Sequence, residues 1–395
     1  MKYNWFVKKL SEIAYINPRE SIGKGAVAKK IPMDKLQPFC RDVPGFVFEA
    51  YRGGTKFRNG DTIMARITPC LENGKIAKVS ILSEDEVGFG STEYIVFRAI
   101  DGISDADFLY YLICSPLIRN PAIKSMVGSS GRQRVQTDMI ANLDIELPPI
   151  EEQRKIGGIL KQLDDKIEIN NRINNNLEQQ MQALFNEYLS SNKFYDLTTV
   201  KDVVLSANTG ADAIQKAPIV DYDTGIRCIR VGDMTNNRSF HDWGFTKVTD
   251  DVFKRYQLHK DDIVVTRTAS LGLNTIISED LPAVYNNGLI RLTVNTSNVL
   301  PLYLFRQFQT EDFSNYIACI ESETSVRPNM KINYLLKYEF VLPPITKQNE
   351  IIALLTPMLN QQNNLIVENK HLEALRDTLL PKLMSGELDV YDIDL

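Results

Sequence analysis

The chain has 395 residues, of which 44% are hydrophobic, and a formal net charge of −5. That length exceeds one ordinary domain and predicts two or more domains. The sequence holds no run of about 18 apolar residues, which argues against a membrane-spanning helix. Its five cysteines form no CxxC pair, which argues against a zinc site or a disulfide framework. We therefore expect a protein of the reducing cytoplasm.

The charge is distributed unevenly along the chain. Residues 1–147 carry 20 Lys and Arg against 17 Asp and Glu, whereas residues 194–342 carry 15 against 18. The tail from residue 343 carries 4 against 8. A protein that binds DNA alone usually presents a basic face. The excess of acid in the second half predicts that any DNA binding is shared with a partner.

Residues 1–147 are predicted to form a first globular domain of strands and turns. The run Glu93–Phe97 is rich in β-branched and aromatic residues and is typical of a strand. Glycine-containing turns are expected at Arg52-Gly53-Gly54, Asn59-Gly60 and Asn73-Gly74.

Residues 148–193 are predicted to form a long helix. Leu147-Pro148-Pro149-Ile150 interrupts the preceding structure, and proline is well placed just before a helix. Glu151 and Glu152 in the first turn suit its positive end. Apolar residues then recur at alternating steps of four and three from Ile156 to Tyr188, which predicts a coiled-coil seam.

The second half of the chain repeats the first. Leu-Pro-Pro-Ile recurs at residues 342–345, an offset of 195, and the segment Asp61–Arg66 resembles Asp262–Arg267, an offset of 201. Residues 194–342 are therefore predicted as a second globular domain and residues 343–395 as a C-terminal spacer helix. The six-residue slip between the offsets indicates a shared framework with different loops.

This repeat predicts an α+β fold in which two mixed α/β domains are joined by two long helices. The second helix carries its own seam from Ile351 to Leu383, and neither helix can bury such a stripe alone. We expect the two to pack as an antiparallel coiled coil within a pseudo-two-fold repeat. Pro357 is expected to kink the second helix or to restrict its regular part, and Pro381 to end it.

Two polar residues interrupt the seams at corresponding positions, Asn174 and Asn369. A buried Asn fixes the register of a coiled coil at some cost in stability. The alternative is that both side chains are solvated at the edge of the seam, and the sequence leaves both interpretations open.

Motifs for catalysis are absent from the sequence. It contains no GxxxxGK[ST] loop, no Asn/Asp-Pro-Pro-aromatic motif of adenine methyltransferases and no Gly-rich cofactor loop. The three histidines are scattered. We therefore predict no catalytic residues, no metal and no cofactor. Asp61 and Asp262, the carboxylates that recur in both halves, are expected to close turns before strands.

If the chain binds DNA, the contacts are expected from basic and polar loop residues, because Arg pairs well with guanine and Asn or Gln with adenine. An exposed surface charge without a DNA role is the alternative for each. Arg66 and Arg267 recur in both halves, which predicts a shared structural or phosphate role. The candidate DNA-binding residues are Tyr51, Arg52, Lys56, Arg58, Arg66, Arg132, Gln133, Arg134, Arg227, Arg230, Arg267, Asn286, Arg327 and Asn329.

These landmarks resemble the specificity subunits of type I restriction–modification systems, and the resemblance covers nearly the whole chain. Each motif alone is weak, whereas their order and spacing are specific. Thr346-Lys347 replaces the Glu-Glu of the first copy, a small departure. The segments that carry the resemblance are Asn59–Pro69, Asn73–Lys75, Gly88–Val96, Leu147–Gln153, Leu163–Ile167, Asp262–Arg267, Arg327–Asn329 and Leu375–Glu387.

The resemblance implies that two target-recognition domains lie at opposite ends of the helix pair and each reads one half of a split DNA site. It implies that the helices set the half-site spacing and dock two methyltransferase subunits, which bring S-adenosylmethionine and methylate a flipped adenine. Endonuclease/translocase subunits join the full complex. Methylation and cleavage are thus assigned to partners.

Two other interpretations compete with this one. A coiled-coil protein-interaction scaffold without a DNA role is favoured slightly by the acidic balance but disfavoured by the basic loop clusters. A self-sufficient modification enzyme is disfavoured because the catalytic motifs are missing.

Overall fold

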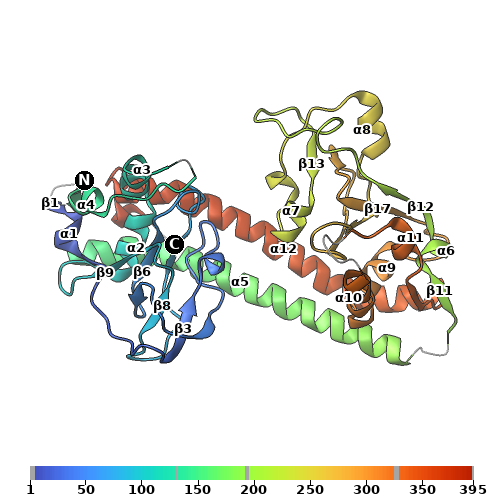
Figure 1. Ribbon diagram of the computed structural model, residues 1–395, viewed down its shortest axis with the longest axis horizontal. Helices are drawn as coiled ribbons and strands as arrows, with labels where there is room; N and C mark the ends of the chain where they lie inside the picture. Colours follow the sequence, from blue (N-terminus) through green and yellow to red (C-terminus); the bar gives the residue numbers. More distant parts are fainter. Residues whose placement is uncertain (1–4, 130, 192–194, 324–328, 394–395) are drawn as a thin grey trace. The chain divides into compact units, whose positions relative to one another are not determined.

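The computed structural model describes residues 5–129, 131–191, 195–323 and 329–393 (Figure 1). The chain divides into two compact units. The first unit comprises Met1–Ile173 and Asn364–Leu395, and the second comprises Asn174–Asn363. Each unit therefore contains one globular domain and about half of each long helix.

The two long helices are α5 (Ile150–Ser191) and α12 (Ile345–Met384), and they pack together as the seams predicted. In the first unit Asp164 of α5 contacts Arg376 of α12, and Asn170 contacts Asn369. Residue numbers rise along one helix as they fall along the other, so the helices are antiparallel.

The same direction holds in the second unit. The Asn174 carbonyl accepts a hydrogen bond from Gln362 at 2.9 Å, and the Tyr188 hydroxyl donates to the Lys347 carbonyl at 2.9 Å.

Helix α12 runs through both of its prolines. It continues past Pro381 to Met384, so the prediction that Pro381 ends the helix was wrong by three residues. A proline removes only one N–H donor. The carbonyl of Pro381 still accepts from the Ser385 N–H at 3.0 Å, which closes the final turn.

Asn369 is buried in this helix pair, with 8% of its surface exposed. The interpretation that it is solvated at the edge of the seam was therefore wrong. Its amide oxygen accepts from Asn170 at 2.8 Å, and its amide nitrogen donates to Asn171 at 2.9 Å. Asn174 is only half-buried.

The globular part of the first unit is built on a four-stranded antiparallel sheet of order β2-β9-β6-β7, a second sheet of order β4-β3-β8-β5, and the pair β1-β10. The strands are β1 (Phe6–Lys9), β2 (Ala14–Ile16), β3 (Val27–Ile31), β4 (Val47–Ala50), β5 (Lys56–Phe57), β6 (Thr62–Ala65), β7 (Ile76–Lys78), β8 (Gly88–Gly90), β9 (Tyr94–Ala99) and β10 (Asp144–Leu147). The short helices are α1 (Leu10–Ile13), α2 (Ala106–Cys114), α3 (Pro116–Lys124), α4 (Thr137–Ala141) and the 3-10 turns η1 (Met33–Lys35) and η3 (Val390–Asp392).

The second unit has a four-stranded antiparallel sheet of order β12-β17-β14-β15, the parallel pair β13-β16 and the pair β11-β18. Its strands are β11 (Leu197–Thr199), β12 (Val204–Thr209), β13 (Arg227–Ile229), β14 (Ile263–Thr266), β15 (Asn274–Ile276), β16 (Ala283–Tyr285), β17 (Leu289–Val294) and β18 (Glu339–Val341). Its short helices are α6 (Val200–Val203), α7 (Val231–Thr235), α8 (Asp250–Tyr256), α9 (Pro301–Gln307), α10 (Glu311–Glu323), α11 (Ile332–Leu336) and the 3-10 turn η2 (Phe240–Asp242).

The internal repeat is visible in the register of these sheets. Strand β6 pairs with β9 so that Thr62 lies opposite Phe97, and β14 pairs with β17 so that Ile263 lies opposite Leu292. These are corresponding positions of the two halves under the offsets of the sequence. The predicted pseudo-two-fold repeat is thereby confirmed at the level of strand pairing.

Each unit holds two apolar cores. One core of each unit lies against the helices: Ile156 and Leu383 belong to it in the first unit, and Phe185 and Leu355 in the second. The other core lies within the globular domain, around Phe57 in the first unit. In the second unit the corresponding core includes Trp243 and Tyr285.

Candidate nucleic-acid interface

Arg66 and Arg267 hold equivalent loops in the two units. The Arg66 guanidinium donates to the Val135 carbonyl at 3.2 Å, and the Val135 N–H donates back to the Arg66 carbonyl at 2.9 Å. Arg267 Nε donates to the Met330 carbonyl at 3.1 Å, and the Met330 N–H donates back at 2.8 Å. Both side chains therefore have a shared structural role, while a phosphate contact stays a prediction.

The loop held by Arg66 carries Gln133 and Arg134. Arg134 lies against Glu93 with guanidinium–carboxylate distances of 2.7–3.0 Å. This contact lowers the pKa of the Glu93 carboxyl below its usual range. The backbone carbonyl of Gln133 accepts from the Thr68 N–H at 3.1 Å. The half-buried Gln133 side chain has no hydrogen-bond partner among the described residues.

Tyr51, Lys56 and Arg58 form a second group in the first unit. Lys56 Nζ donates to the Glu20 carbonyl at 2.8 Å, and Arg58 Nε donates to the Glu20 carboxylate at 2.8 Å. Lys56 also lies 5.4 Å from the centre of the Tyr51 ring. Two of the predicted DNA-binding cations, Lys56 and Arg58, are thus already bound to Glu20.

The turn between β8 and β9 joins these two groups. The Gly90 N–H donates to the Thr55 carbonyl at 2.8 Å, and Glu93 of the same turn binds Arg134. Gly54 is required beside this turn because its φ is +115° and a Cβ there would lie 2.1 Å from the Gly90 carbonyl oxygen.

In the second unit three candidates gather where β13 and β16 end. Arg230 and Asn286 each follow the last paired residue of their strand, Ile229 and Tyr285. Arg230 donates to the Ala217 carbonyl at 2.7 Å.

Arg267 joins this group through the turn that follows β16. It donates to the Asn287 carbonyl at 3.1 Å, and the side-chain oxygen of Asn286 accepts from the Gly288 N–H at 3.3 Å. Asn286 therefore shapes the turn to which Arg267 is bound.

Of the three remaining candidates of the second half, Arg227 begins β13, Asn329 lies beside Arg267, and one lies outside the described residues. Arg227 packs 4.0 Å from the centre of the Phe245 ring and donates to the Trp243 carbonyl. Asn329 is exposed and pairs through its backbone with Thr268. Arg327 lies outside the described residues.

Arg52 and Arg132 are the exposed cations of the candidate set that have no side-chain partner in the described part of the chain. Their guanidinium groups are therefore available to a phosphate or a base edge without loss of an internal contact.

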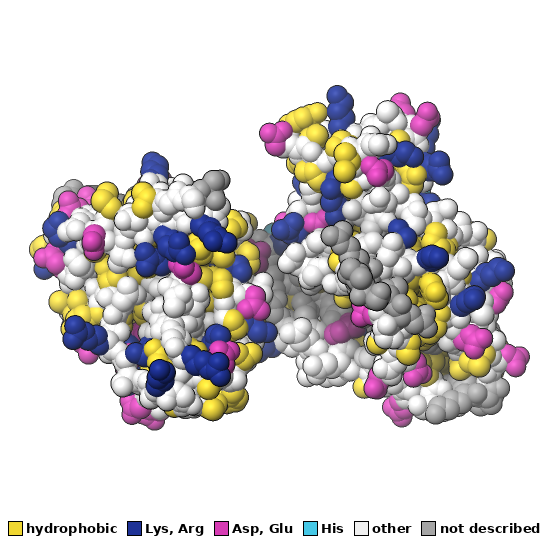
Figure 2. Space-filling view, in the orientation of Figure 1, with side chains coloured by type: hydrophobic (Ala, Val, Ile, Leu, Met, Phe, Trp, Pro, Cys, Tyr) yellow, Lys and Arg dark blue, Asp and Glu magenta, His cyan; other side chains and the backbone are white. Residues whose placement is uncertain are grey.

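Figure 2 shows Lys and Arg alternating with Asp and Glu across the drawn face of each unit. This mixture fits binding that is shared with another protein.

The recurring carboxylates close turns, as predicted. Asp61 accepts the Arg58 N–H at 2.8 Å, and Asp262 accepts the His259 N–H at 2.9 Å. Burial raises the pKa of the Asp262 carboxyl. Asp61 also binds Arg98 at 2.7 Å through both of its oxygens. Both are structural groups at the start of a strand.

A cavity of about 510 Å³ in the second unit was missed by sequence reasoning. It is lined by Asp233, Arg238 and Trp243 on one side and by Phe313 and Glu321 of α10 on the other. Arg238 binds Asp233 at 3.2 Å. The lining residues come from segments far apart in the chain and recur in no shared motif, so no sequence signal identifies the cavity.

The described residues contain no group of three or more His, Cys, Asp or Glu side chains placed to hold a metal ion. None of the described helices is long and apolar enough to cross a membrane.

Comparison with known proteins assigns the chain to a family. The family model of the type I restriction modification DNA specificity domain matches the chain twice, over residues 3–179 and 189–374. The chain therefore belongs to the type I restriction–modification DNA specificity family, as its motifs indicated.

Individual relatives agree with this assignment. The chain is 22% identical to the type I restriction enzyme HindI specificity subunit of Haemophilus influenzae, over 88% of this chain and 89% of that protein. It is 32% identical to the EcoAI specificity subunit of Escherichia coli over 38% of this chain, a match that spans only 26% of that relative.

A solved structure shares the fold. The crystal structure of the type I restriction–modification S subunit from M. genitalium matches over 96% of both chains with a TM-score of 0.55 and 12% sequence identity.

Proposed function

We propose that this chain is the DNA-recognition subunit of a type I restriction–modification complex, in which each globular domain reads one half of a bipartite site. The observation that carries the proposal is the contrast between repeated and unrepeated parts. Arg66 and Arg267 hold their loops in the same way. The residues around them differ, as Glu93–Arg134 in one unit and Asn286–Asn287 in the other illustrate.

A shared scaffold with different loops suits two readers of different sequences. Phosphate contacts position a protein on DNA, whereas hydrogen bonds to base edges specify sequence. Among the described residues, Arg132 and Gln133 offer side-chain donors without internal partners in the first unit, and Asn286 and Asn329 are candidates in the second. We assign base reading to these loops and alignment to the recurring arginines.

The test is the methylation motif of cells that carry this chain and its partner subunits. Arg132→Ala is expected to weaken binding in the assembled complex or to relax choice at one base pair by about 1–3 kcal/mol. Lys201→Ala, an exposed cation of α6 outside the candidate set, is the control. An unchanged motif with undiminished methylation in Arg132→Ala would remove this residue from the reading set.

We further propose that the helices set the spacing between half-sites. Adding one heptad to both α5 and α12 keeps the seams in phase and lengthens the pair by about 10 Å at 1.5 Å per residue. The spacer of the methylated motif should then lengthen by about three base pairs while both half-sites stay the same. An unchanged spacer would contradict this role of the helices.

Docking of two methyltransferase subunits on the helices is also proposed, with the endonuclease/translocase subunits joining through them. Ile366 and Val367 of α12 and Ile169 of α5, all in the first unit, are each about half exposed. Contiguous exposed apolar surface is typical of protein-binding sites, so these side chains are the candidates for the docking surface. Ile366→Asp with Val367→Asp should reduce the methyltransferase that copurifies from two subunits to one, and the exposed pair Lys370→Asp with Glu373→Lys is the control.

Copurification also separates the proposal from the competing scaffold interpretation. A scaffold without a DNA role would bring down no methyltransferase, and the assembly would show no preference for one DNA sequence. The purified chain alone should transfer no methyl group from labelled S-adenosylmethionine to DNA. Any transfer by the chain alone would overturn the division of labour.

A further inference from the structure

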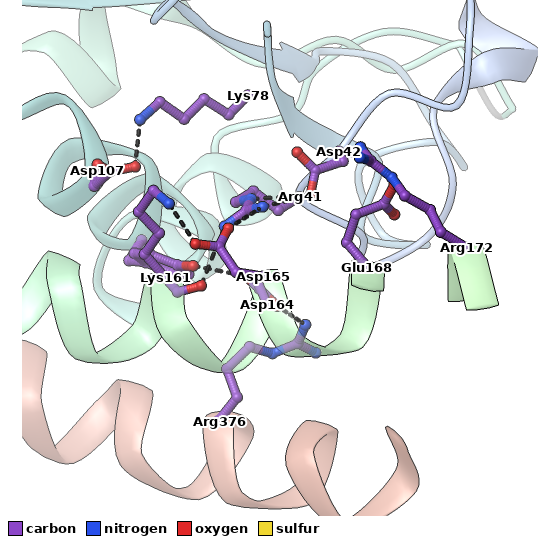
Figure 3. Close-up of polar contacts among 11 residues, drawn as sticks. Arg41, Asp42, Lys78, Asp107, Lys161, Asp164, Asp165, Glu168, Arg172 and Arg376 are labelled. Atoms are coloured by element: carbon purple, nitrogen blue, oxygen red, sulfur yellow. Dashed lines mark hydrogen bonds and ion pairs between the residues drawn. The ribbon is translucent and has the colours of Figure 1, made fainter. Parts of the chain in front are cut away.

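One carboxylate of α5 in each unit binds a donor from the globular domain with one oxygen and a donor from α12 with the other. In the first unit this carboxylate is Asp164, which is 5% exposed. The Tyr111 hydroxyl of α2 donates to its Oδ2 at 2.6 Å, and Arg376 of α12 donates to its Oδ1 at 2.8 Å. Figure 3 shows Arg376 reaching from α12 to Asp164.

In the second unit the carboxylate is Glu178. Arg306 of α9, which is 1% exposed, donates to its Oε1, and Gln362 of α12 donates to its Oε2 at 3.5 Å. Arg306 also contacts the Met181 sulfur at 3.5 Å. Each junction therefore joins three elements of one unit through a single side chain.

The domain-side donors, Tyr111 and Arg306, are separated by the repeat offset of 195. The two carboxylates are not separated by this offset, since the position that corresponds to Asp164 is Leu359 on α12. Both carboxylates lie on α5, two heptads apart, and their α12 partners Arg376 and Gln362 are also two heptads apart. The junctions therefore recur in the structure although the repeat of the sequence does not dictate them.

Stability alone does not account for such junctions. The Asp164–Arg376 pair is buried, and replacing such a pair by apolar residues of similar size often leaves a protein as stable or more stable. The Glu178 side chain is 45% exposed, and partly exposed ion pairs add little stability. In some proteins directional polar contacts instead favour one geometry over near alternatives. Burial and the nearby Asp164 raise the pKa of the Tyr111 hydroxyl above its usual range, which keeps it protonated as a donor. Apolar packing would let the domain tilt on the helix pair, and three-way hydrogen bonding opposes this.

We propose that Asp164 and Glu178 are positioning residues that fix the tilt of each recognition domain on the helix pair and thereby restrict the spacer lengths that the complex accepts. The inference rests on the proposed function. In this inference the helices set the preferred spacer length, and the two junctions determine how far the complex accepts other lengths.

The test uses Tyr111→Phe and Arg306→Met in the full chain. Each variant removes the link to the domain, keeps a similar apolar shape and leaves the Asp164–Arg376 or Gln362–Glu178 link between the helices. Glu168→Gln is the matched control, because Glu168 pairs with Arg172 within α5 and contacts neither the domain nor α12 in the described contacts.

The first measurement is methylation by the assembled complex of duplexes that carry its own half-sites with the spacer unchanged or altered by one base pair. The ratio of rates on unchanged and altered spacers should fall at least threefold in Tyr111→Phe and in Arg306→Met. It should stay at the wild-type value in Glu168→Gln. A purely structural role would lower all rates together and leave this ratio unchanged, which would overturn the proposal.

The second measurement needs no DNA. In a background without the five cysteines, spin labels replace Asp101 of the domain and Gln162 of α5, both exposed residues of the first unit. The distance distribution between them should broaden in Tyr111→Phe and stay narrow in Glu168→Gln. An unchanged width in folded Tyr111→Phe would also overturn the proposal.

The two measurements separate this inference from the proposed function. A wild-type assembly that prefers no DNA site would reject the proposed function and the spacer role with it, whatever the label distances show. A wild-type assembly that reads a bipartite site while both variants keep its spacer ratio would reject the junction role alone.

Discussion

Gln153 and Gln348 make the same three hydrogen bonds in the two repeats. The Gln153 amide nitrogen donates to the Pro148 carbonyl at 2.8 Å and to the Ile103 carbonyl at 3.0 Å, and its oxygen accepts from the Asp105 N–H at 3.0 Å. This side chain binds the start of α5 to the segment that leads into α2.

The copy in the second unit is equally buried, at 0% against 1% exposed. Gln348 donates to the carbonyls of Pro343 at 2.8 Å and Asn298 at 3.2 Å, and it accepts from the Leu300 N–H at 2.8 Å. Every partner is shifted by the same 195 residues. The repeated glutamine thus connects each domain to the start of its long helix by hydrogen bonds.

Replacing Gln153 by Met keeps its length but leaves buried backbone groups without partners, which costs about 1–3 kcal/mol for an unsatisfied group. Gln153→Met should therefore destabilise the first unit by at least that amount. The two tryptophans lie in different units, so the fluorescence of Trp5 in a Trp243→Phe background follows urea unfolding of the first unit. Exposed Gln162→Met, within about 0.5 kcal/mol of wild type, is the control, and an equal midpoint for both variants would contradict the prediction.

Arg267→Met tests the structural role of the recurring arginines. The change removes hydrogen bonds to the Met330 and Asn287 carbonyls. We expect the second unit to lose about 1–2 kcal/mol of stability, since each net hydrogen bond contributes about 0.5–1.5 kcal/mol. Trp243 fluorescence during urea unfolding measures this loss.

The same variant should leave the sequence of both methylated half-sites unchanged, because residues shared by the two halves do not distinguish them. A stable Arg267→Met chain with an altered motif would show that Arg267 reads a base.

Arg132→Gln tests phosphate contact. Each phosphate neutralised on duplex DNA contributes about 0.9 to the slope of log affinity against log salt. If Arg132 contacts a phosphate, the slope of the assembled complex should fall by about one, with affinity lost nearly uniformly across sequences. Binding titrations at several salt concentrations measure the slope. An unchanged slope with a changed base preference would assign Arg132 to a base edge.

The repeat explains how much of this architecture was predictable. Leu-Pro-Pro-Ile, the Asp-to-Arg strand and the two seams indicated the helix pair and the pseudo-two-fold repeat. Such features depend on local spacing, which a sequence displays directly. For Arg66 and Arg267 the sequence indicated a shared role but left open whether it is structural or a phosphate contact.

Contacts between distant segments were not predictable. Glu93 binds Arg134 across 41 residues, and Asp164 binds Arg376 across 212. No periodicity connects such positions, so neither ion pair was predictable from the sequence. The cavity beside Trp243 was missed for the same reason.

Asp165 gives a prediction about how the stability of the first unit depends on pH. Burial would raise the pKa of its carboxyl, but hydrogen bonds from Lys161 and Arg41 lower it below the usual range overall. Arg41 and Asp165 lie 2.8 Å apart. Figure 3 shows the two side chains facing each other. A carboxyl whose pKa is lower in the folded than in the unfolded chain adds stability above its ordinary pKa and loses that stability as pH falls through the folded value.

Asp165→Asn should therefore destabilise the first unit at pH 7 by up to about 1 kcal/mol, the range for partly exposed ion pairs. The difference from wild type should persist down to about pH 4, the usual carboxyl pKa, and shrink only at lower pH as Asp165 becomes protonated in the folded chain. Unfolding curves at pH 7, at pH 3.5 and at about pH 2 test this, with exposed Asp101→Asn as the control. A difference that grew at low pH would contradict the sign.

Asn170 and Asn369 give a prediction about specificity within the helix pair. Asn170 is fully buried, and its amide oxygen has no partner among the described residues although its nitrogen binds Asn369 and Glu368. An unsatisfied buried polar atom costs about 1–3 kcal/mol. Asn170→Leu with Asn369→Leu should therefore stabilise the first unit by about 1–2 kcal/mol, whereas Asn369→Leu alone should destabilise it because Asn170 loses a partner.

The stabilised double variant should lose pairing specificity, since a polar residue on a coiled-coil seam selects one register and one oligomeric state. Light scattering of the purified chain should then show self-association that the wild type lacks at the same concentration. A double variant that was less stable than Asn369→Leu, or that stayed in the wild-type oligomeric state, would show that these two residues do not determine register. In that case apolar packing around Leu163 and Leu372 would be sufficient to align α5 with α12.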